Sequence, residues 1–211
     1  MPLAEIEDFL RNKDISNIEE KLMQQKNIVL EKQQELKRIE QKIDHRLNGL
    51  SEAQNMPLDI VTLVQFPASR IVWVDAPLKI EASQDMEAPI RKLDQSQAEA
   101  VVFLGKVGLG ISAEHLQTAE YKKYDGIFLK LDDEDIYDGE TMSLAESLCV
   151  RLCFRGSHAE APGQYKKLLD YIKKHRMQIV GFSREITFID YGITNDPEKF
   201  VTEICIPVKC D

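Results

Sequence analysis

The sequence lacks the segments that direct a chain into or across a membrane. It has no apolar run of about 18 residues, the length that a membrane-spanning helix needs. The N-terminus has no basic stretch followed by an apolar one, so it shows no secretory signal. The four cysteines form no CxxC pair. These absences predict a cytoplasmic protein with reduced thiols and no membrane partner.

Clustered positive charge and catalytic motifs are missing as well. The 211 residues carry 27 Lys and Arg against 36 Asp and Glu, a formal net charge of −9. Because phosphate binding needs clustered Lys and Arg, this acidic balance argues against a large nucleic-acid surface on the chain. No Gly-rich phosphate loop, HExxH motif or Ser-His-Asp order is present, and the acidic turn from Asp132 to Asp135 has the wrong spacing for a calcium loop. We therefore expect no catalytic residues, no cofactor and no metal.

Proline and glycine are absent from residues 15–48, which permits one long helix. Aliphatic residues recur there every seven positions, at Ile15, Leu22, Val29, Leu36, Ile43 and Leu50. Such a heptad stripe is buried against a partner helix, so the sequence predicts a dimer-forming coiled coil. The alternative is a long helix packed along its own domain.

The boundaries of this N-terminal region follow from local signals. Leu3, Ile6, Phe9 and Leu10 have helical spacing and predict a short helix over residues 2–12. Asn48-Gly49 is a helix-stop signal. We predict a first domain, residues 1–54, that holds the short helix and the coiled-coil helix.

Residues 58–211 alternate short strands with two helices. The first half contains predicted strands at 60–65, 70–75, 104–112 and 126–131 and a helix at 86–98. The second half contains strands at 148–155, 179–191 and 200–208 and a helix at 162–176. The order strand, helix, strand, strand thus occurs twice. This predicts an α+β fold in which the duplicated unit forms a curved antiparallel sheet, with a ligand groove between the halves.

Two acidic residues in the last strands are candidates for a site. Glu185 lies between Phe182 and Ile186, and a carboxylate among apolar residues is costly unless a cation or donor meets it. The alternative is a solvated glutamate on the outward face of the strand. Glu203 faces away from Ile204, and the two acids would raise each other's pKa if they met. Trp73, the only tryptophan, either packs in the core or lines a pocket.

The C-terminal part resembles the DNA gyrase inhibitor-like effector-binding domain. The resemblance rests on Arg155-Gly156-Ser157-His158, on Glu185-Ile186-Thr187-Phe188 and on the run from Thr194 to Val208. Residues 1–50 resemble the segment of MerR-type transcription regulators that follows the DNA-binding head. The resemblance implies a homodimer through an antiparallel coiled coil and a small-molecule effector that is cationic or aromatic. It implies contact with DNA only through a head module that is absent from this chain: either the sequence is a truncation, which its Met-Pro start favours, or the natural protein lacks DNA binding.

The resemblance also implies ligand-binding residues. In multidrug regulators of this kind, the strand of Glu185 offers a buried glutamate to cationic drugs. Tyr124 matches a pocket tyrosine, and Phe200 matches a pocket aromatic without its hydroxyl. Ala161 stands where relatives have an aromatic residue. Trp73 is the fourth candidate for a ligand-binding residue. Two other functions stay open: a small-molecule hydrolase that uses the pocket glutamate, and a protein-binding module of the gyrase inhibitor type.

Overall fold

The computed structural model of the chain describes residues 15–79, 106–133, 135 and 137–210. The helices predicted at 2–12 and 86–98 lie outside the described residues. Contacts divide the chain into two compact units, residues 1–45 and 46–211. The predicted domains, 1–54 and 58–211, remain a prediction.

The long helix, α2, spans Ile15–Asn55 and continues through the predicted stop at Asn48-Gly49. A glycine inside a helix costs only about 1 kcal/mol, which packing of the following turn offsets. That turn belongs to the second unit and carries Ala53, which is buried against Ile189 and Val201 of the same unit. The predicted end was therefore wrong, because tertiary contacts outweigh the local signal.

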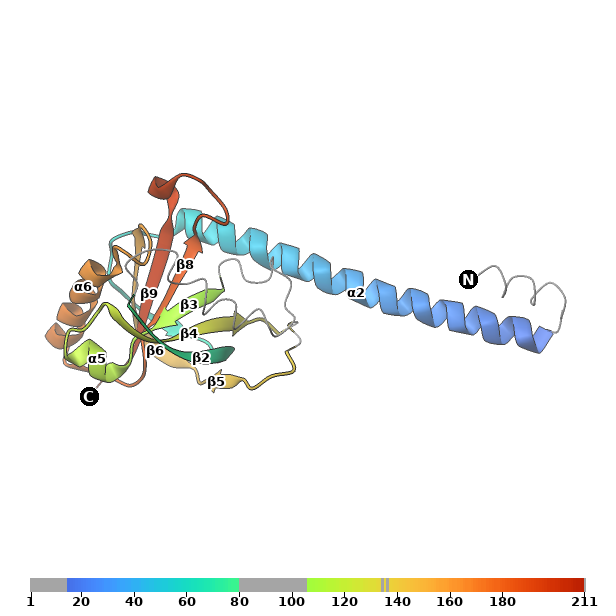
Figure 1. Ribbon diagram of the computed structural model, residues 1–211, viewed down its shortest axis with the longest axis horizontal. Coiled ribbons are helices and arrows are strands. Elements are labelled where there is room, and N and C mark those ends of the chain that lie inside the picture. The colour runs from blue at the N-terminus through green and yellow to red at the C-terminus, as the bar shows by residue number, and fades with distance from the viewer. Residues whose placement is uncertain (1–14, 80–105, 134, 136, 211) are drawn as a thin grey trace. The chain divides into compact units, whose positions relative to one another are not determined.

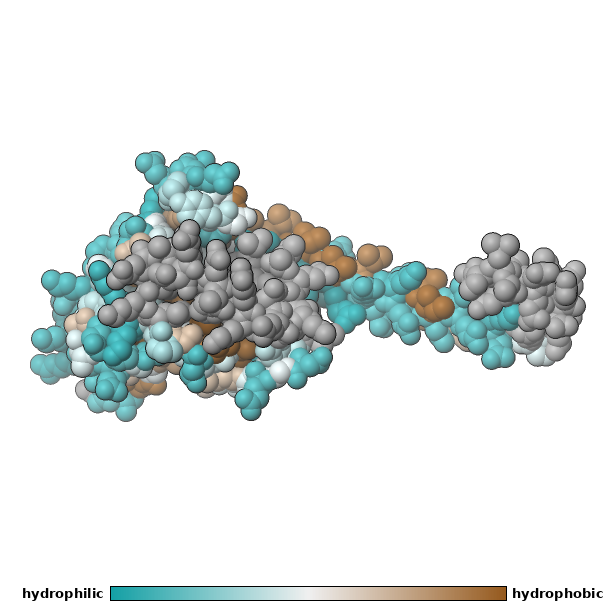
Figure 2. All heavy atoms as spheres, in the orientation of Figure 1, coloured by the Kyte–Doolittle hydropathy of each residue, from teal (hydrophilic) through white to brown (hydrophobic). Residues whose placement is uncertain are grey.

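The heptad stripe of α2 is exposed within the first unit. Leu22, Val29, Leu36 and Ile43 keep between 53% and 64% of their surface accessible. Figure 2 shows the corresponding hydrophobic patches recurring along the helix. An apolar stripe that its own unit leaves open is typical of a helix that packs against a partner.

Among the described residues, nine strands form one curled antiparallel sheet, which confirms the predicted α+β fold. In chain order these are β1 (Thr62–Phe66), β2 (Ser69–Lys79), β3 (Val107–Gly110), β4 (Lys123–Leu131), β5 (Met142–Leu144), β6 (Ser147–Arg155), β7 (Met177–Ile179), β8 (Arg184–Ile189) and β9 (Val201–Cys210). Their order across the sheet is β1-β6-β9-β8-β3-β4-β2-β5, with β7 paired to β9. The helical elements are α5 (Ala113–Gln117), α6 (Ala161–Lys174) and the 3-10 turn η2 (Pro197–Lys199).

The predicted duplication is visible in the pairing of the strands. In the first half β4 lies between β2 and β3, and in the second half β9 lies between β6 and β8. The halves join where β3 pairs with β8, at Gly108↔Ile186 and Leu109↔Glu185. The strand that precedes each half in the sequence pairs with a strand of the other half: β1 pairs with β6, and β5 pairs with β2. Glu185 therefore lies at the junction of the two repeats.

The strand predicted at 179–191 is in fact two strands, β7 and β8. Both pair with β9, at Ile179↔Val208 and Arg184↔Cys205. Between these two pairs, the segment 179–184 is longer than the facing segment 205–208, so it bulges out of the ladder. The cause is a competing partner, since the amide of Ser183 donates to the carbonyl oxygen of Ile111 at 2.8 Å.

The main core lies between one face of the sheet and the two helices α5 and α6, which Figure 1 shows on the same side of the sheet. Strand residues Leu109, Ile127 and Ile204 pack there against Leu168 of α6 and Leu116 of α5. Val, Ile and Leu at every second strand position produce this face. No helix of the described part of the chain is long and apolar enough to cross a membrane.

Candidate functional site

Strand β8 presents polar residues on the side that α6 covers. Ser183, Glu185 and Thr187 alternate with residues of the opposite face and therefore share one face. Glu185 is opposite Leu109 and Ile204 in the register, and both are fully buried. The exposed fraction of Glu185 is 0%. The carboxylate thus lies in the main core, not on an outward face of the strand.

Two side chains from other elements bind this carboxylate. The Tyr124 hydroxyl, from β4, donates to both Glu185 oxygens at 3.1 Å. His158, in the loop before α6, places Nδ1 at 2.6 Å from Glu185 Oε1. Its side chain is 13% exposed and is the part of this group nearest to solvent. The 2.6 Å contact of His158 is as short as hydrogen bonds to a charged group are.

Tyr165 of α6 completes the ring of donors. Its hydroxyl lies 2.9 Å from Ser183 Oγ, which accepts the amide hydrogen of Ile111 at 3.1 Å. Either hydroxyl can be the donor in the Tyr165–Ser183 contact, and the carboxylate of Glu185 is a further hydrogen-bond partner of the Tyr165 phenol. Burial, the negative charge of Glu185 and the hydrogen bond to it raise the pKa of Tyr124 well above the ordinary tyrosine value. Burial and Glu185 raise the pKa of Tyr165 in the same direction. Both phenols stay protonated and can donate.

Thr187 extends the network to the other side of the histidine. Its Oγ1 lies 3.3 Å from His158 Nε2 and 2.9 Å from Oγ1 of Thr202. Thr202 in turn donates to the carbonyl oxygen of Gly156 at 2.7 Å. The polar side chains of this face are therefore linked in one chain of hydrogen bonds across β8, β9 and the loop before α6.

The structure brings two of the four predicted ligand-binding residues, Glu185 and Tyr124, into direct contact. Phe200 is buried, and its ring packs edge-on against Tyr191 at 4.8 Å between centroids. Its carbonyl oxygen accepts from the amide of Gly156, so its backbone borders the loop that carries His158.

Trp73, the fourth predicted residue, lies on the opposite face of the sheet. It pairs with Phe128, which pairs with Gly108 and through it with Ile186. Its ring lies directly against Gly126, since a Cβ on this glycine would meet the ring at 2.3 Å. It also packs on Phe182, with ring centroids 4.7 Å apart. Trp73 therefore belongs to an aromatic cluster separate from the Glu185 site.

Glu203 is a second buried carboxylate, and it also lies on the opposite face. In the register it pairs with Ile186 while Glu185 pairs with Ile204, so the two acids cannot meet. Burial raises the pKa of Glu203, and Arg151 at 3.8 Å counters this rise. Burial and the charge of Glu203 raise the pKa of Cys153 to about 12. No group of three or more His, Cys, Asp or Glu among the described residues is placed to hold a metal ion.

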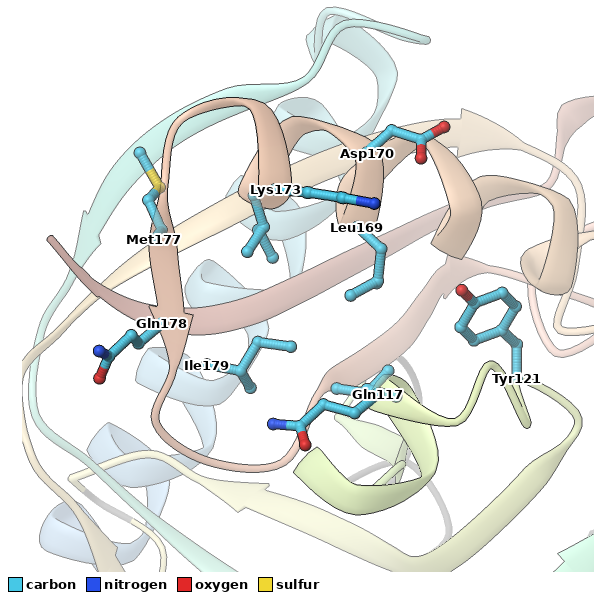
Figure 3. A pocket seen from close by; sticks show the side chains of 10 residues that line it. Gln117, Tyr121, Leu169, Asp170, Lys173, Met177, Gln178 and Ile179 are labelled. Atoms are coloured by element: carbon cyan, nitrogen blue, oxygen red, sulfur yellow. The ribbon is translucent and has the colours of Figure 1, made fainter. Parts of the chain in front are cut away.

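A groove of about 640 Å³ lies between α5, α6 and β7, beside the buried site (Figure 3). Tyr121 stands at one side of it and Met177 at the other. The ring of Tyr121 stacks on that of Tyr165 with 5.7 Å between centroids and 14° between planes. Tyr121, which lines the groove, thus contacts Tyr165, which belongs to the Glu185 site.

Several residues of the site escape sequence reasoning. His158 is predicted only as part of a matching motif, and Tyr165 is only one residue of the helix predicted at 162–176. The available signal was the period of two in Ser183, Glu185 and Thr187, which marks a polar row inside an apolar strand.

The family of the chain is shown by its match to a family model. The model of the GyrI-like small molecule binding domain matches residues 60–209, most of the chain. The chain belongs to this family. No match was found among curated proteins.

Solved structures share the fold at low sequence identity. The C-terminal domain of EcmrR is 14% identical with a TM-score of 0.55, over 72% of this chain and 98% of that one. EcmrR in complex with DNA is 16% identical with a TM-score of 0.57, over 100% of this chain and 78% of that one. A hydrolase from Listeria innocua is 14% identical with a TM-score of 0.46, over 74% of this chain and 94% of that one. At these identities the EcmrR likeness shows the fold alone, and the score of the hydrolase supports nothing further.

Proposed function

We propose that this chain is the effector-sensing and dimerising region of a MerR-type transcription regulator, and that it takes up a small cationic, aromatic compound at Glu185. The observation that carries the proposal is a carboxylate with no exposed surface in a domain of a small-molecule-binding family. The likeness to EcmrR covers the whole chain, so it includes both the long helix and the effector domain in the same order. This shared order supports the part of the proposal that concerns transcription regulation.

The chemistry of the site favours a cation. A carboxylate removed from water interacts strongly with a positive charge, because the surrounding dielectric is low. Tyr124 and Tyr165 reach this carboxylate with their hydroxyls, so two aromatic side chains stand near it, and aromatic rings attract cations. An aromatic cation therefore finds a negative charge and aromatic side chains in the same part of the domain.

The site is closed in this structure, so uptake of a ligand requires some side chains to move. Glu185 and Tyr165 have no exposed surface, and Tyr124 is 1% exposed. His158 lies on a loop and keeps some exposure. We expect the ligand to enter by displacing this loop, since the residues on strands are held by the ladders of the sheet.

Binding of tetraphenylphosphonium tests the proposal. We expect the wild-type chain to bind this cation in isothermal titration calorimetry, and Glu185→Gln to weaken binding at least about tenfold, which corresponds to about 1.4 kcal/mol. Glu203→Gln is the matched control, because it removes a buried carboxylate from the opposite face. Tetraphenylborate, with the same shape and a negative charge, is the control ligand. Equal binding of the anion, or an unchanged affinity of Glu185→Gln, would contradict the proposal.

The dimer part of the proposal rests on the exposed heptad stripe. Leu36 is on the stripe and 64% exposed, whereas Gln34 is on another side of the helix. We expect sedimentation to show a dimer that Leu36→Lys dissociates and Gln34→Lys leaves intact. A wild-type monomer at micromolar concentration would contradict the coiled-coil reading.

A hydrolase is the second candidate, because the structure supplies what the sequence alone did not. Tyr124 and His158 stand beside Glu185 as proton donors, so a carboxylate that directs water has an acid next to it. Turnover of a small electrophilic compound that is lost in Glu185→Gln and kept in Glu203→Gln would favour this function. Binding without turnover favours the sensor.

A further inference from the structure

The hydrogen bonds around His158 have a fixed direction. The Gly156 carbonyl oxygen can only accept, so the single hydroxyl proton of Thr202 goes to it. The 2.9 Å contact between the two threonines must then use the proton of Thr187. Thr187 Oγ1 is left as an acceptor toward His158 Nε2, at 3.3 Å. The Nε2 atom of His158 therefore carries a proton.

The other ring nitrogen also shares a proton. His158 Nδ1 lies 2.6 Å from Glu185 Oε1, and a hydrogen must lie between these two atoms. With Nε2 already protonated, this second proton makes the His158–Glu185 pair neutral as a whole.

The neighbouring groups leave this charge balance unchanged. Tyr124 from β4 and Tyr165 from α6 stay neutral, because burial raises the pKa of each phenol. Glu160, two residues after His158, accepts from the amide and the hydroxyl of Ser157 instead. The described residues that face the pair from β4, β8, β9 and α6 thus add no further charge to it.

We infer that His158 is the resident counter-ion of Glu185, and that a cationic ligand takes its place and expels one proton to solvent. The inference rests on the proposed function, since it concerns how that same site accepts a cation. The positive charge of the ligand replaces the shared proton of the pair, so the net charge beside Glu185 stays the same. No bond other than that to the proton is broken.

Proton release makes the affinity depend on pH in a defined direction. One proton released per cation bound means that affinity rises about tenfold per pH unit over the range in which the free pair holds the proton and the displaced imidazole does not. A permanent cation then binds poorly in acid and better as the pH rises. His158 therefore favours ligands whose charge can compete with an imidazolium for Glu185.

Calorimetry with tetraphenylphosphonium in buffers of different ionisation enthalpy at one pH counts the proton directly. We expect the wild-type chain to release about one proton per cation bound, with an affinity that rises with pH as above. His158→Gln keeps a neutral donor for Glu185 but has no proton that titrates. We expect this variant to bind without proton release and with a flat pH profile.

The outcomes separate the inference from the proposed function. Binding that needs Glu185 but releases no proton from the wild-type chain overturns the inference and leaves the proposed function standing. Wild-type release that persists unchanged in His158→Gln also overturns it, because the proton then comes from elsewhere. Absence of binding at every pH overturns both. If His158→Gln does not fold, the proton count of the wild-type chain decides.

Discussion

Replacement of Tyr124 by phenylalanine tests whether Glu185 is held as a buried charge. Tyr124 is 1% exposed, and its hydroxyl donates to both carboxylate oxygens at 3.1 Å. A hydrogen bond to a charged group contributes about 1.5–3 kcal/mol, against about 1 kcal/mol for a neutral pair. Phenylalanine fills nearly the same volume, so no cavity adds to the cost. His158 and Tyr165 remain as donors, so we expect a loss of about 2 kcal/mol in the free energy of unfolding.

The assay is urea unfolding of the full chain, followed by tryptophan fluorescence. Trp73 is the only tryptophan and packs on the sheet, so the signal reports on the effector domain and not on residues 15–45 of α2. In thermal unfolding, a loss of about 2 kcal/mol corresponds to a lower midpoint by about 4–8 °C for a domain of this size. Tyr191→Phe is the matched control, because Tyr191 is 60% exposed. Its effect should stay within about 0.5 kcal/mol.

A loss for Tyr124→Phe no larger than that of Tyr191→Phe would refute the reasoning. It would mean that the hydroxyl does not stabilise a charge, so that Glu185 is either protonated or satisfied by other donors. A loss well above about 3 kcal/mol would also be informative, since only an orphaned buried charge has so large a cost.

Alkaline pH gives a second prediction. The pKa of Tyr124 and that of Tyr165 are raised in the folded chain. Their contribution to stability is therefore complete below the ordinary tyrosine pKa of 10.0 and is lost as the pH rises above it. We expect the tyrosinate absorbance of both to appear only together with unfolding; ionisation in the folded chain would contradict the burial of the phenols. A third prediction compares two glycines: Gly126→Ala forces a Cβ against Trp73 and should cost about 1–3 kcal/mol. Gly163→Ala in α6 meets nothing within 4 Å and should be neutral or stabilising in the same urea experiment, and equal effects would contradict the packing of Trp73 on the sheet.

The elements that sequence reasoning predicts well are those set by local periodicity. The heptad stripe from Ile15 predicts α2, and the alternation of Leu148, Val150 and Leu152 predicts β6. The errors come where a distant partner overrides a local signal. Packing of Ala53 carries α2 past Gly49, and the bond from Ser183 to Ile111 divides the predicted strand at 179–191.

The candidate site shows the same limit. Glu185 stood out in the sequence as an acid in an apolar strand, and Tyr124 came only from the family resemblance; the structure brings the two into contact. Sequence reasoning missed the role of His158, since nothing local indicates which carboxylate a loop histidine reaches. It also left open whether Glu203 meets Glu185, because only the β8–β9 register decides to which face each acid points.

The most direct test of the account is a crystal structure of the chain with tetraphenylphosphonium. The account predicts the cation against the carboxylate of Glu185, beside the ring of Tyr124, with His158 moved out of hydrogen-bonding distance of that carboxylate. A cation bound instead in the groove beside Tyr121, or on the Trp73 face with the His158–Glu185 contact intact, would contradict it.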